Sequence, residues 1–201
     1  MVLVPEGEFT FGSDHNKKLL SLDSFYMDKF EVSVRLYAKF LQDTGRSQPR
    51  DWPQQLAIVN SGDRPVVGIT WNDADAYCRH YGKRLPTEQE WEKAARGNDG
   101  RKYPWGNDEP TDRHALFNAK WNGYGTLAVV ESHDAGRSPY GIYNMAGNVW
   151  EWTSSDDDKL KVLRGGSWHT GAVEVTYSIG WYPDDQGDNV RGFRCVQDTP
   201  K

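Results

Sequence analysis

Short motifs that combine glycine with aromatic residues are the feature of this chain that most constrains its fold. Two of them, LRGGSW at residues 163–168 and RGFRC at residues 191–195, bracket a segment that contains no Lys or Arg. Glycine disfavours long regular helices, and each large aromatic side chain can bury a wide apolar area on its own. The 201-residue chain carries 20 Gly, 10 Pro, nine Trp, ten Tyr and seven Phe. This pattern predicts short elements held together by aromatic packing rather than a helical bundle.

Charge and hydropathy argue against two kinds of partner. Lys and Arg are scattered singly in a chain of net charge −5, so the sequence predicts no nucleic-acid surface. No apolar run approaches the roughly 18 residues that a direct membrane span requires. The first residues lack the pattern of a signal peptide. The sequence as written therefore predicts a cytoplasmic protein, or a secreted or surface protein if a leader has been removed.

Capping residues and apolar spacing predict three short helices in a single domain over residues 1–201. The helices are expected at residues 33–43, 72–81 and 87–96, and a glycine follows each of them closely. Thr87 and Glu90 form a capping box at the start of the third helix, which satisfies two backbone amides.

Alternating or aromatic-rich segments predict several short strands. They are expected at residues 2–11 (two pieces), 24–32, 141–143, 148–153, 161–165, 176–181 and 192–196. Residues 48–63 and 98–138 are rich in polar and turn-forming residues, which predicts loops there.

Seven short motifs give the chain a resemblance to a known family. They are MDKFEV at 27–32, PVVGITW at 65–71, RLPT at 84–87, YPWG at 103–106, NMAGNVWEW at 144–152, RGGSW at 164–168 and GFRC at 192–195. In this order they resemble the formylglycine-generating enzyme (sulfatase-modifying factor) family, a branch of the C-type lectin fold. The resemblance covers essentially the whole chain. It implies an α+β fold in which short helices flank a twisted, mainly antiparallel sheet, but a fold alone does not define a function.

The oxidation chemistry of that family is not expected here. Active members carry two cysteines, five positions apart, shortly after the Gly-Gly-Ser-aromatic element, and their thiolates bind copper(I). The corresponding residues in this chain are Thr170 and Val175, which supply no thiolate. The five histidines also lack the His-x3-His spacing of an iron-binding relative. Neither copper nor iron is therefore expected.

Cys78 and Cys195 admit two interpretations. Two cysteines are too few for a disulfide framework, and a pair of buried thiols packed as small apolar groups fits the residues alone. The family resemblance implies the alternative, because cysteines at these two sites can form a bridge in relatives.

A ligand-binding branch of the same fold suggests a different function. Some of its members are variable proteins of diversity-generating retroelements, which mutate a C-terminal segment while the scaffold keeps its shape. The matching segment here covers about residues 168–190. Adenine-directed mutagenesis of Asn-type codons does not produce Trp, Lys, Glu, Gln or Met. Between His169 and Val190 these types occur only at Glu174, Trp181 and Gln186, which permits this interpretation without establishing it.

The same segment carries large apolar groups and an acidic end. Alternation at residues 173, 175, 177, 179 and 181 predicts one face of a strand, which is either an exposed aromatic binding surface or part of the core. For an exposed surface, the predicted ligand-contacting residues are Trp168, His169, Thr170, Val173, Val175, Tyr177, Ile179, Trp181, Tyr182, Asp184, Asp185 and Asp188.

The family resemblance also implies a structural calcium ion. Oxygen ligands around the Gly-Asn-x-Trp-Glu turn hold it in relatives, which points here to Asn148, Glu151 and nearby backbone oxygens. A second calcium site in relatives matches Asn118, but the following loop offers no Asp to complete it. The alternative for Asn148 and Glu151 is hydrogen bonding within a tight turn, without metal.

The sequence therefore favours a non-catalytic protein that binds a protein or surface ligand through residues 168–190. A sugar is less favoured, because the Glu-Pro-Asn signature of sugar-binding lectins is absent. Two alternatives stay open: a metal-dependent oxidoreductase or accessory member of the family, and an inactive paralogue that regulates an active relative. The oligomeric state is not defined by the sequence.

Overall fold

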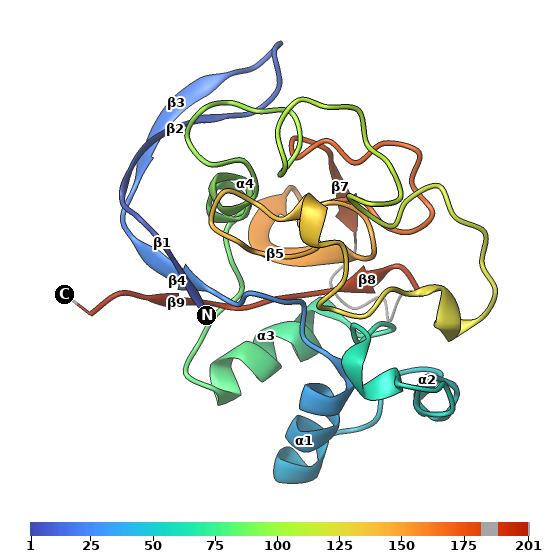
Figure 1. The fold of residues 1–201 in the computed structure, drawn as a ribbon. Coiled ribbons are helices and arrows are strands. Elements are labelled where there is room, and N and C mark those ends of the chain that lie inside the picture. Colours follow the sequence, from blue (N-terminus) through green and yellow to red (C-terminus); the bar gives the residue numbers. More distant parts are fainter. Residues whose placement is uncertain (182–188, 201) are drawn as a thin grey trace.

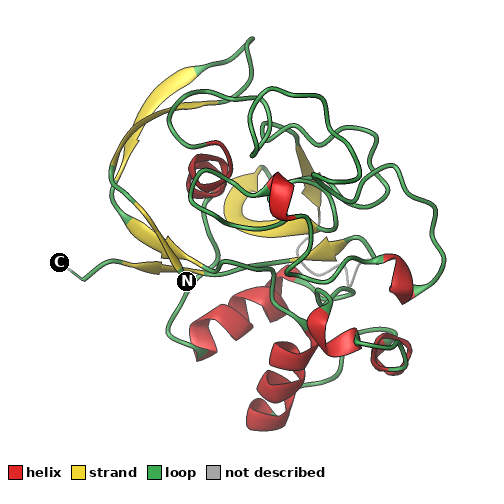
Figure 2. Ribbon diagram, viewed as in Figure 1, coloured by secondary structure: helices red, strands yellow, loops and turns green. Residues whose placement is uncertain are grey.

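The computed structural model describes residues 1–181 and 189–200 (Figure 1). In this part of the chain, short helices accompany three small sheets, and a long run of loops joins α4 to β5 (Figure 2). All strand pairs except that of β5 with β8 are antiparallel. The predicted α+β fold, with short helices beside mainly antiparallel sheets, is confirmed.

The first sheet joins the two ends of the chain. Its central strand β4 (Phe25–Met27) lies between β1 (Val2–Val4) and β9 (Val196–Asp198). A second sheet is the curved hairpin of β2 (Gly7–Phe11) and β3 (Lys18–Leu22), which passes beside helix α4 (Glu88–Arg96) in Figure 1. The hairpin and the helix are in direct contact.

The third sheet has the strand order β7-β6-β5-β8. Its hairpin consists of β5 (Trp150–Asp157) and β6 (Leu160–Arg164), and β7 (Ser178–Trp181) adds to β6. The short strand β8 (Arg191–Gly192) lies parallel to β5. This sheet therefore fixes both ends of the segment that the sequence predicts to bind a ligand.

Three of the α-helices agree with the predicted ranges to within one or two residues. They are α1 (Val34–Thr44), α3 (Trp71–His80) and α4. Their N-cap side chains, Ser33, Thr70 and Thr87, each accept a hydrogen bond from a backbone amide in the first turn. The capping box of Thr87 and Glu90 is confirmed. Within residues 1–181 and 189–200, no helix has the length and apolar character to cross a membrane.

Helix α2 (Trp52–Leu56) lies within residues 48–63, which the sequence predicts as a loop. Trp52 is buried, and its ring centroid lies 6.1 Å from that of Tyr37 in α1. Five residues are too few to show a helical period, so only this packing reveals the helix. Three 3₁₀ turns also lie in the predicted loops, at Ser61–Asp63, Tyr124–Thr126 and Asp134–Gly136.

Several predicted strands are shorter in the structure or absent. Residues 24–32 form a strand only at β4, residues 192–196 are divided between β8 and β9, and β3 was not predicted. Residues 141–143 are irregular instead of a strand, because they follow a turn at residues 139–140 whose flanking backbone groups bond locally. Gly141 N donates to Ser138 O at 2.8 Å, and Ser138 N donates to Ile142 O at 2.9 Å.

Aromatic rings fill the core, as the composition predicts. The rings of Tyr37 and Tyr77 stack with centroids 5.8 Å apart, and Phe193 lies edge-on to both. Trp91 is fully buried beneath Gly165, where an added Cβ atom would lie 3.0 Å from the indole ring. Gly165 also has a φ of +98°, so both its conformation and its space require glycine.

Cys78 and Cys195 form a disulfide, which decides between the two interpretations of the sequence. Their Cα atoms are 5.7 Å apart, and the bridge joins the end of α3 to the segment before β9. The cysteines are 117 residues apart in sequence, so the bridge closes a long loop in the unfolded chain.

Replacing Cys78 and Cys195 together by Ala is expected to lower the free energy of unfolding by about 2–5 kcal/mol. The unfolded chain regains the entropy that the closed loop removes. Urea denaturation under oxidising conditions measures the difference, and wild-type protein kept reduced serves as the matched control. Equal stability of the oxidised wild type and the double variant would contradict this expectation.

Candidate functional site

An ion pair between Arg194 and Glu151 occupies the centre of the domain. Arg194 Nη2 donates to Glu151 Oε1 at 2.6 Å, and Arg194 Nε donates to Oε2 at 2.7 Å. The indole of Trp91 donates to the same Oε2 at 2.8 Å. Both charged side chains are fully buried. Burial disfavours the charged guanidinium, but Glu151 raises the pKa of Arg194 above its ordinary value.

Backbone carbonyls take up the remaining donors of Arg194. Its Nη1 donates to the carbonyls of Asp28 and Lys29, at 3.3 and 3.4 Å, and its Nη2 donates to the carbonyl of Tyr143 at 2.8 Å. The guanidinium therefore joins the segment after β4, the turn before β5 and β5 itself. These contacts fix β5, which pairs with β6, and β6 in turn pairs with residues 178–181.

Glu31 is a second buried carboxyl beside this ion pair. Its two oxygens accept hydrogen bonds of 2.8 Å from the amide nitrogens of Asn144 and Asn148. Burial raises the pKa of Glu31 to about 8, although the charge of Arg194 lowers it. Near neutral pH the centre therefore combines the Arg194–Glu151 ion pair with a neighbouring carboxyl, Glu31, that is mostly protonated.

The substitution Glu31→Gln is expected to weaken the pH dependence of stability. The folded-state pKa of about 8 lies above the ordinary value of 4.5, so the folded protein binds this proton more tightly than the unfolded chain. The stability contributed by the proton is complete below pH 4.5 and is lost as the pH rises through 8. Urea denaturation over this pH range measures the effect, and Glu131→Gln at an exposed carboxylate is the control. Identical pH profiles for wild type and Glu31→Gln would contradict the assignment.

The residues predicted to hold calcium have other partners. Asn148 Oδ1 accepts from Ala128 N at 2.9 Å, and both oxygens of Glu151 accept from the donors described above. The side-chain oxygens of Asn148 and Glu151 therefore accept hydrogen bonds from protein donors in this structure, in agreement with the metal-free alternative. Asn118 lies on an exposed loop, where its backbone N donates to Thr170 O at 2.9 Å.

One buried oxygen near this centre has no donor in ordinary hydrogen-bond geometry, although His133 interacts with the same amide side chain. Asn144 Oδ1 is buried and has no hydrogen-bond partner in the part of the chain that the structure describes. Asn144 belongs to the NMAGNVWEW motif, but nothing in the sequence pattern distinguishes its side chain from the others in that motif. Across the same described ranges, no group of three or more His, Cys, Asp or Glu side chains could hold a metal ion.

Residues 173–181 do not form one strand with a single apolar face. Only Ser178–Trp181 is a strand, and the preceding residues turn, with Tyr177 N donating to Glu174 O at 2.9 Å. Val173 and Val175 are buried, the first beside Tyr103 and the second in the cluster that contains Trp91. Trp168 is buried as well. All three residues form part of the core, which is the alternative that the sequence left open for this face, and their contact with a ligand stays an untested prediction.

Other members of the predicted set do reach the surface. Tyr177 and Trp181 are 40% and 38% exposed, His169 is exposed, and Thr170 and Ile179 are partly exposed. The ring of Tyr177 lies 5.2 Å from that of Trp150, and the guanidinium of Arg191 lies 4.4 Å from the ring of Trp181. The predicted residues Tyr182, Asp184, Asp185 and Asp188 lie outside the described residues.

Trp121 is a surface residue that the sequence analysis did not identify. It is 38% exposed, and its ring lies 5.1 Å from Trp168 and 5.2 Å from Tyr124. Two backbone hydrogen bonds hold its loop against residues 168–170, from Asn118 N to Thr170 O and from Ala119 N to Trp168 O. A tryptophan within a predicted polar loop was the available signal. We call His169, Tyr177, Ile179, Trp181 and Trp121 the aromatic surface.

Thr170 and Val175 have structural contacts at the positions where active relatives carry cysteines. The Thr170 hydroxyl accepts from Ser167 N and donates to Ser167 O, each at 2.8 Å. Val175 is fully buried, and its N donates to Lys102 O at 3.1 Å. Neither residue offers a thiolate or another soft metal ligand.

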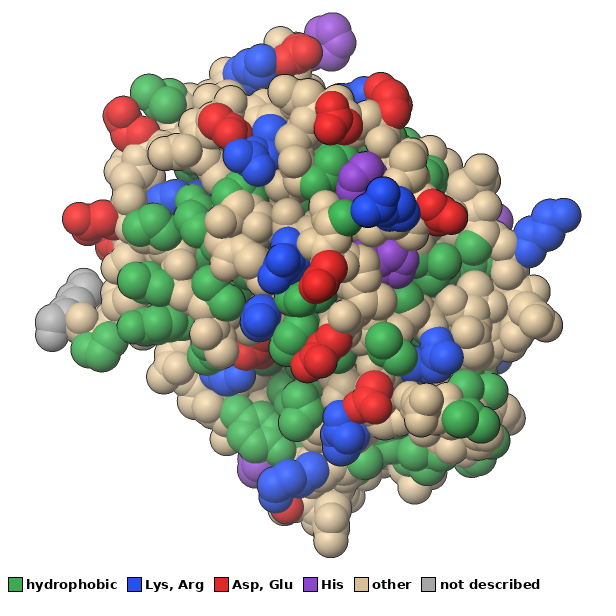
Figure 3. Space-filling model, in the orientation of Figure 1, with side chains coloured by type: hydrophobic (Ala, Val, Ile, Leu, Met, Phe, Trp, Pro, Cys, Tyr) green, Lys and Arg blue, Asp and Glu red, His purple; other side chains and the backbone are tan. Residues whose placement is uncertain are grey.

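Charges of both signs are interspersed over the face shown in Figure 3. No broad area of one sign is visible on that face. The distribution agrees with the scattered Lys and Arg residues of the sequence.

The sequence matches one protein family over nearly its full length. The family, described as "Sulfatase-modifying factor enzyme 1-like domain", matches residues 1–199. The inactive C-alpha-formylglycine-generating enzyme 2 of Bos taurus is 43% identical in an alignment of 151 positions, which covers 66% of this chain and 50% of that protein. The chain thus spans about half the length of that relative.

Two solved structures share the fold. PvdO from Pseudomonas aeruginosa has a TM-score of 0.81 at 20% identity, over 98% of this chain and 93% of that one. Treponema denticola variable protein 1 has a TM-score of 0.75 at 19% identity, over 99% of this chain and 95% of that one. The predicted fold of the formylglycine-generating enzyme branch is therefore confirmed.

Proposed function

The chain belongs to the sulfatase-modifying factor enzyme 1-like family, and from this membership we propose that it is a non-catalytic member that binds a protein or surface ligand. The aromatic surface is the contact region. The observation that carries the proposal is the exposure of Tyr177, Trp181 and Trp121 on a frame fixed by buried contacts. Large rings with few torsions lose little entropy when they bind a partner.

The replacement of both cysteine positions supports a non-catalytic role. Thr170 and Val175 cannot bind copper(I) as two thiolates do, and both contribute to the local structure instead. The name of the bovine relative, which is 43% identical, states that it is inactive. The similarity to this inactive relative covers half of the relative's length.

The segment is also organised in a way that suits diversification. Val173, Val175 and Trp168 anchor it in the core, whereas His169 and Tyr177 between and beside them are exposed. Changes at the exposed positions leave the anchors in place. We propose a retroelement-diversified variable protein, with support from the shared fold of Treponema denticola variable protein 1. This origin requires a reverse transcriptase gene and a template repeat near the gene.

Substituting Tyr177, Trp181 or Trp121 by Ala is expected to abolish partner capture with little change in stability. Each ring is more than a third exposed, so its removal opens no closed cavity. Partners are captured from the surface fraction of the source organism on immobilised protein and identified by mass spectrometry. Thermal unfolding is measured for each variant.

Val175→Ala is the matched control for these variants. It truncates a fully buried side chain in the same segment, and we expect it to cost about 1–3 kcal/mol of stability. Capture by its folded fraction is expected to continue. If the three aromatic variants capture the partner as wild type does, the aromatic surface is not the contact region.

Metal analysis tests the alternative of a metal-dependent oxidoreductase. Purified protein is expected to contain no stoichiometric copper or iron, because Thr170 and Val175 supply no ligand for either. One mole of either metal per mole of protein, measured by plasma mass spectrometry, would support the enzyme instead. Calcium at Asn148, Glu151 and nearby backbone oxygens stays an untested prediction, with hydrogen bonding within the turn as its alternative. A chelator-induced fall in melting temperature would support calcium, and an unchanged melting temperature would support the hydrogen-bonded turn.

A further inference from the structure

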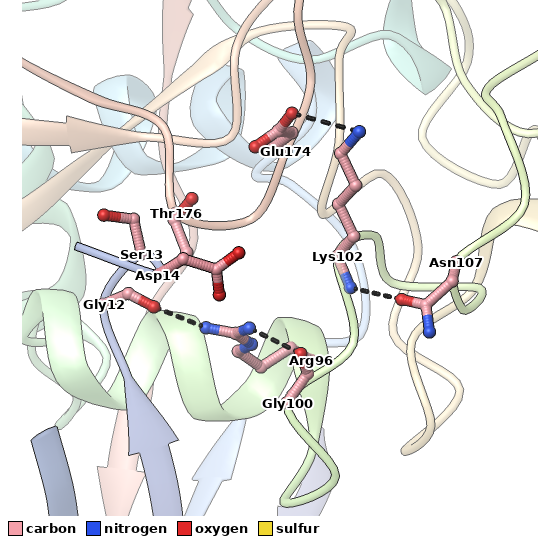
Figure 4. Close-up of a pocket in the computed structure, with 9 residues that line it drawn as sticks. All are labelled: Gly12, Ser13, Asp14, Arg96, Gly100, Lys102, Asn107, Glu174 and Thr176. Atoms are coloured by element: carbon pink, nitrogen blue, oxygen red, sulfur yellow. Dashed lines mark hydrogen bonds and ion pairs between the residues drawn. The ribbon is translucent and has the colours of Figure 1, made fainter. Parts of the chain in front are cut away.

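A pocket opens where the tip of the β2–β3 hairpin meets the end of α4 (Figure 4). Its volume is about 240 Å³. Three segments far apart in sequence line it: Gly12, Ser13, Asp14, Arg96, Gly100, Lys102, Asn107, Glu174 and Thr176. No residue of the aromatic surface is among them, although Glu174 and Thr176 lie in the same segment as Tyr177.

The buried charge in this pocket is already balanced. Arg96 is buried, and its Nη1 donates to Glu92 Oε1 at 2.8 Å. Carbonyls of Gly12 and Gly100 accept further hydrogen bonds from its Nη1 and Nη2, at 3.0 and 2.8 Å. Glu92 also pairs with the buried Arg164, which has Glu88 as a second partner at 3.8 Å, so two carboxylates face two guanidiniums. Because the donors of Arg96 are in use within this cluster, Arg96 attracts an anion only weakly.

The accessible charges of the pocket are two carboxylates, each paired with a lysine. Lys102 Nζ lies 3.3 Å from Glu174 Oε1, and both side chains are 44% exposed. Lys17 Nζ lies 2.5 Å from the more exposed Asp14. Exposed pairs of this kind contribute little free energy, so a ligand can replace a lysine at small cost.

We propose that this pocket binds an arginine side chain of a partner, with the guanidinium group at the Glu174 carboxylate. A guanidinium presents two parallel N–H donors to a carboxylate, whereas the ammonium of Lys102 reaches it as a single point charge. The hydroxyls of Ser13 and Thr176 offer further acceptors on the same walls (Figure 4). The net charge of −5 favours the approach of a cationic partner.

Small probes test the pocket without knowledge of the partner. N-acetyl-arginine amide is titrated into ¹⁵N-labelled protein, and the backbone amide shifts of Gly12, Gly100 and Thr176 are followed. N-acetyl-citrulline amide has nearly the same shape without the charge, and N-acetyl-glutamate amide carries the opposite charge. We expect saturable shifts at the pocket with the arginine probe alone.

Three variants make the assignment specific. Glu174→Gln is expected to weaken arginine binding roughly fivefold, and Lys102→Met is expected to strengthen it because the competing ammonium is removed. Glu131→Gln, at an exposed carboxylate that does not line the pocket, is expected to leave it unchanged. Glu174 and Lys102 are both nearly half exposed, so the variants are expected to keep the fold.

Each other outcome overturns the proposal. Equal shifts with the citrulline probe would remove the role of charge, and binding of the glutamate probe would make the pocket an anion site. Absence of shifts, or insensitivity to Glu174→Gln, would leave no arginine site. These results are independent of partner capture through the aromatic surface, so either proposal can fail while the other stands.

Discussion

The ion pair between Arg194 and Glu151 is the interaction on which the rest of the domain depends. Removing two charges from water is costly, and a buried pair is tolerated only when its remaining donors and acceptors are satisfied. Arg194 meets this condition by donating to Glu151 and to the carbonyls of Asp28, Lys29 and Tyr143. The indole of Trp91 donates a further hydrogen bond to the Glu151 carboxylate. The same contacts join the segment after β4, helix α4, the turn before β5 and the last residues before β9. The side chain of Arg194 therefore connects segments of the chain that long helices or strands do not connect.

This frame explains how residues 168–181 can be both fixed and open. Val173 and Val175 are inserted into separate core clusters, and Trp168 is held at its indole nitrogen by Asn189 O at 3.0 Å. After Val173 the backbone turns, with Tyr177 N donating to Glu174 O, and Tyr177 and Trp181 beyond the last anchor lie at the surface. Side chains at the exposed positions can change without loss of core packing. Thr170 and Val175 belong to the same support: the Thr170 hydroxyl bonds to the backbone of Ser167, and Val175 is fully buried.

Some of this could be predicted from the sequence and some could not. The capping box of Thr87 and the aromatic core depend on local patterns or on composition, so they are visible in one dimension. The alternation from Val173 to Trp181 was misleading, because a period of two produces a strand only where a partner strand continues alongside. Within this segment, only residues 178–181 pair with β6. Trp121 and Asn144 acquire their roles from contacts with residues distant in sequence, such as Trp168 and Glu31. Spacing alone carries no record of such contacts.

Hydroxyl-radical footprinting of the free protein tests the central claim most directly, since the aromatic surface can bind a partner only if it is open. The account predicts rapid oxidation of Tyr177, Trp181 and Trp121 beside protection of Trp91 and Trp152, which are fully buried. Protection of all five rings to the same degree would contradict it, because the surface would then be covered and could not receive a partner.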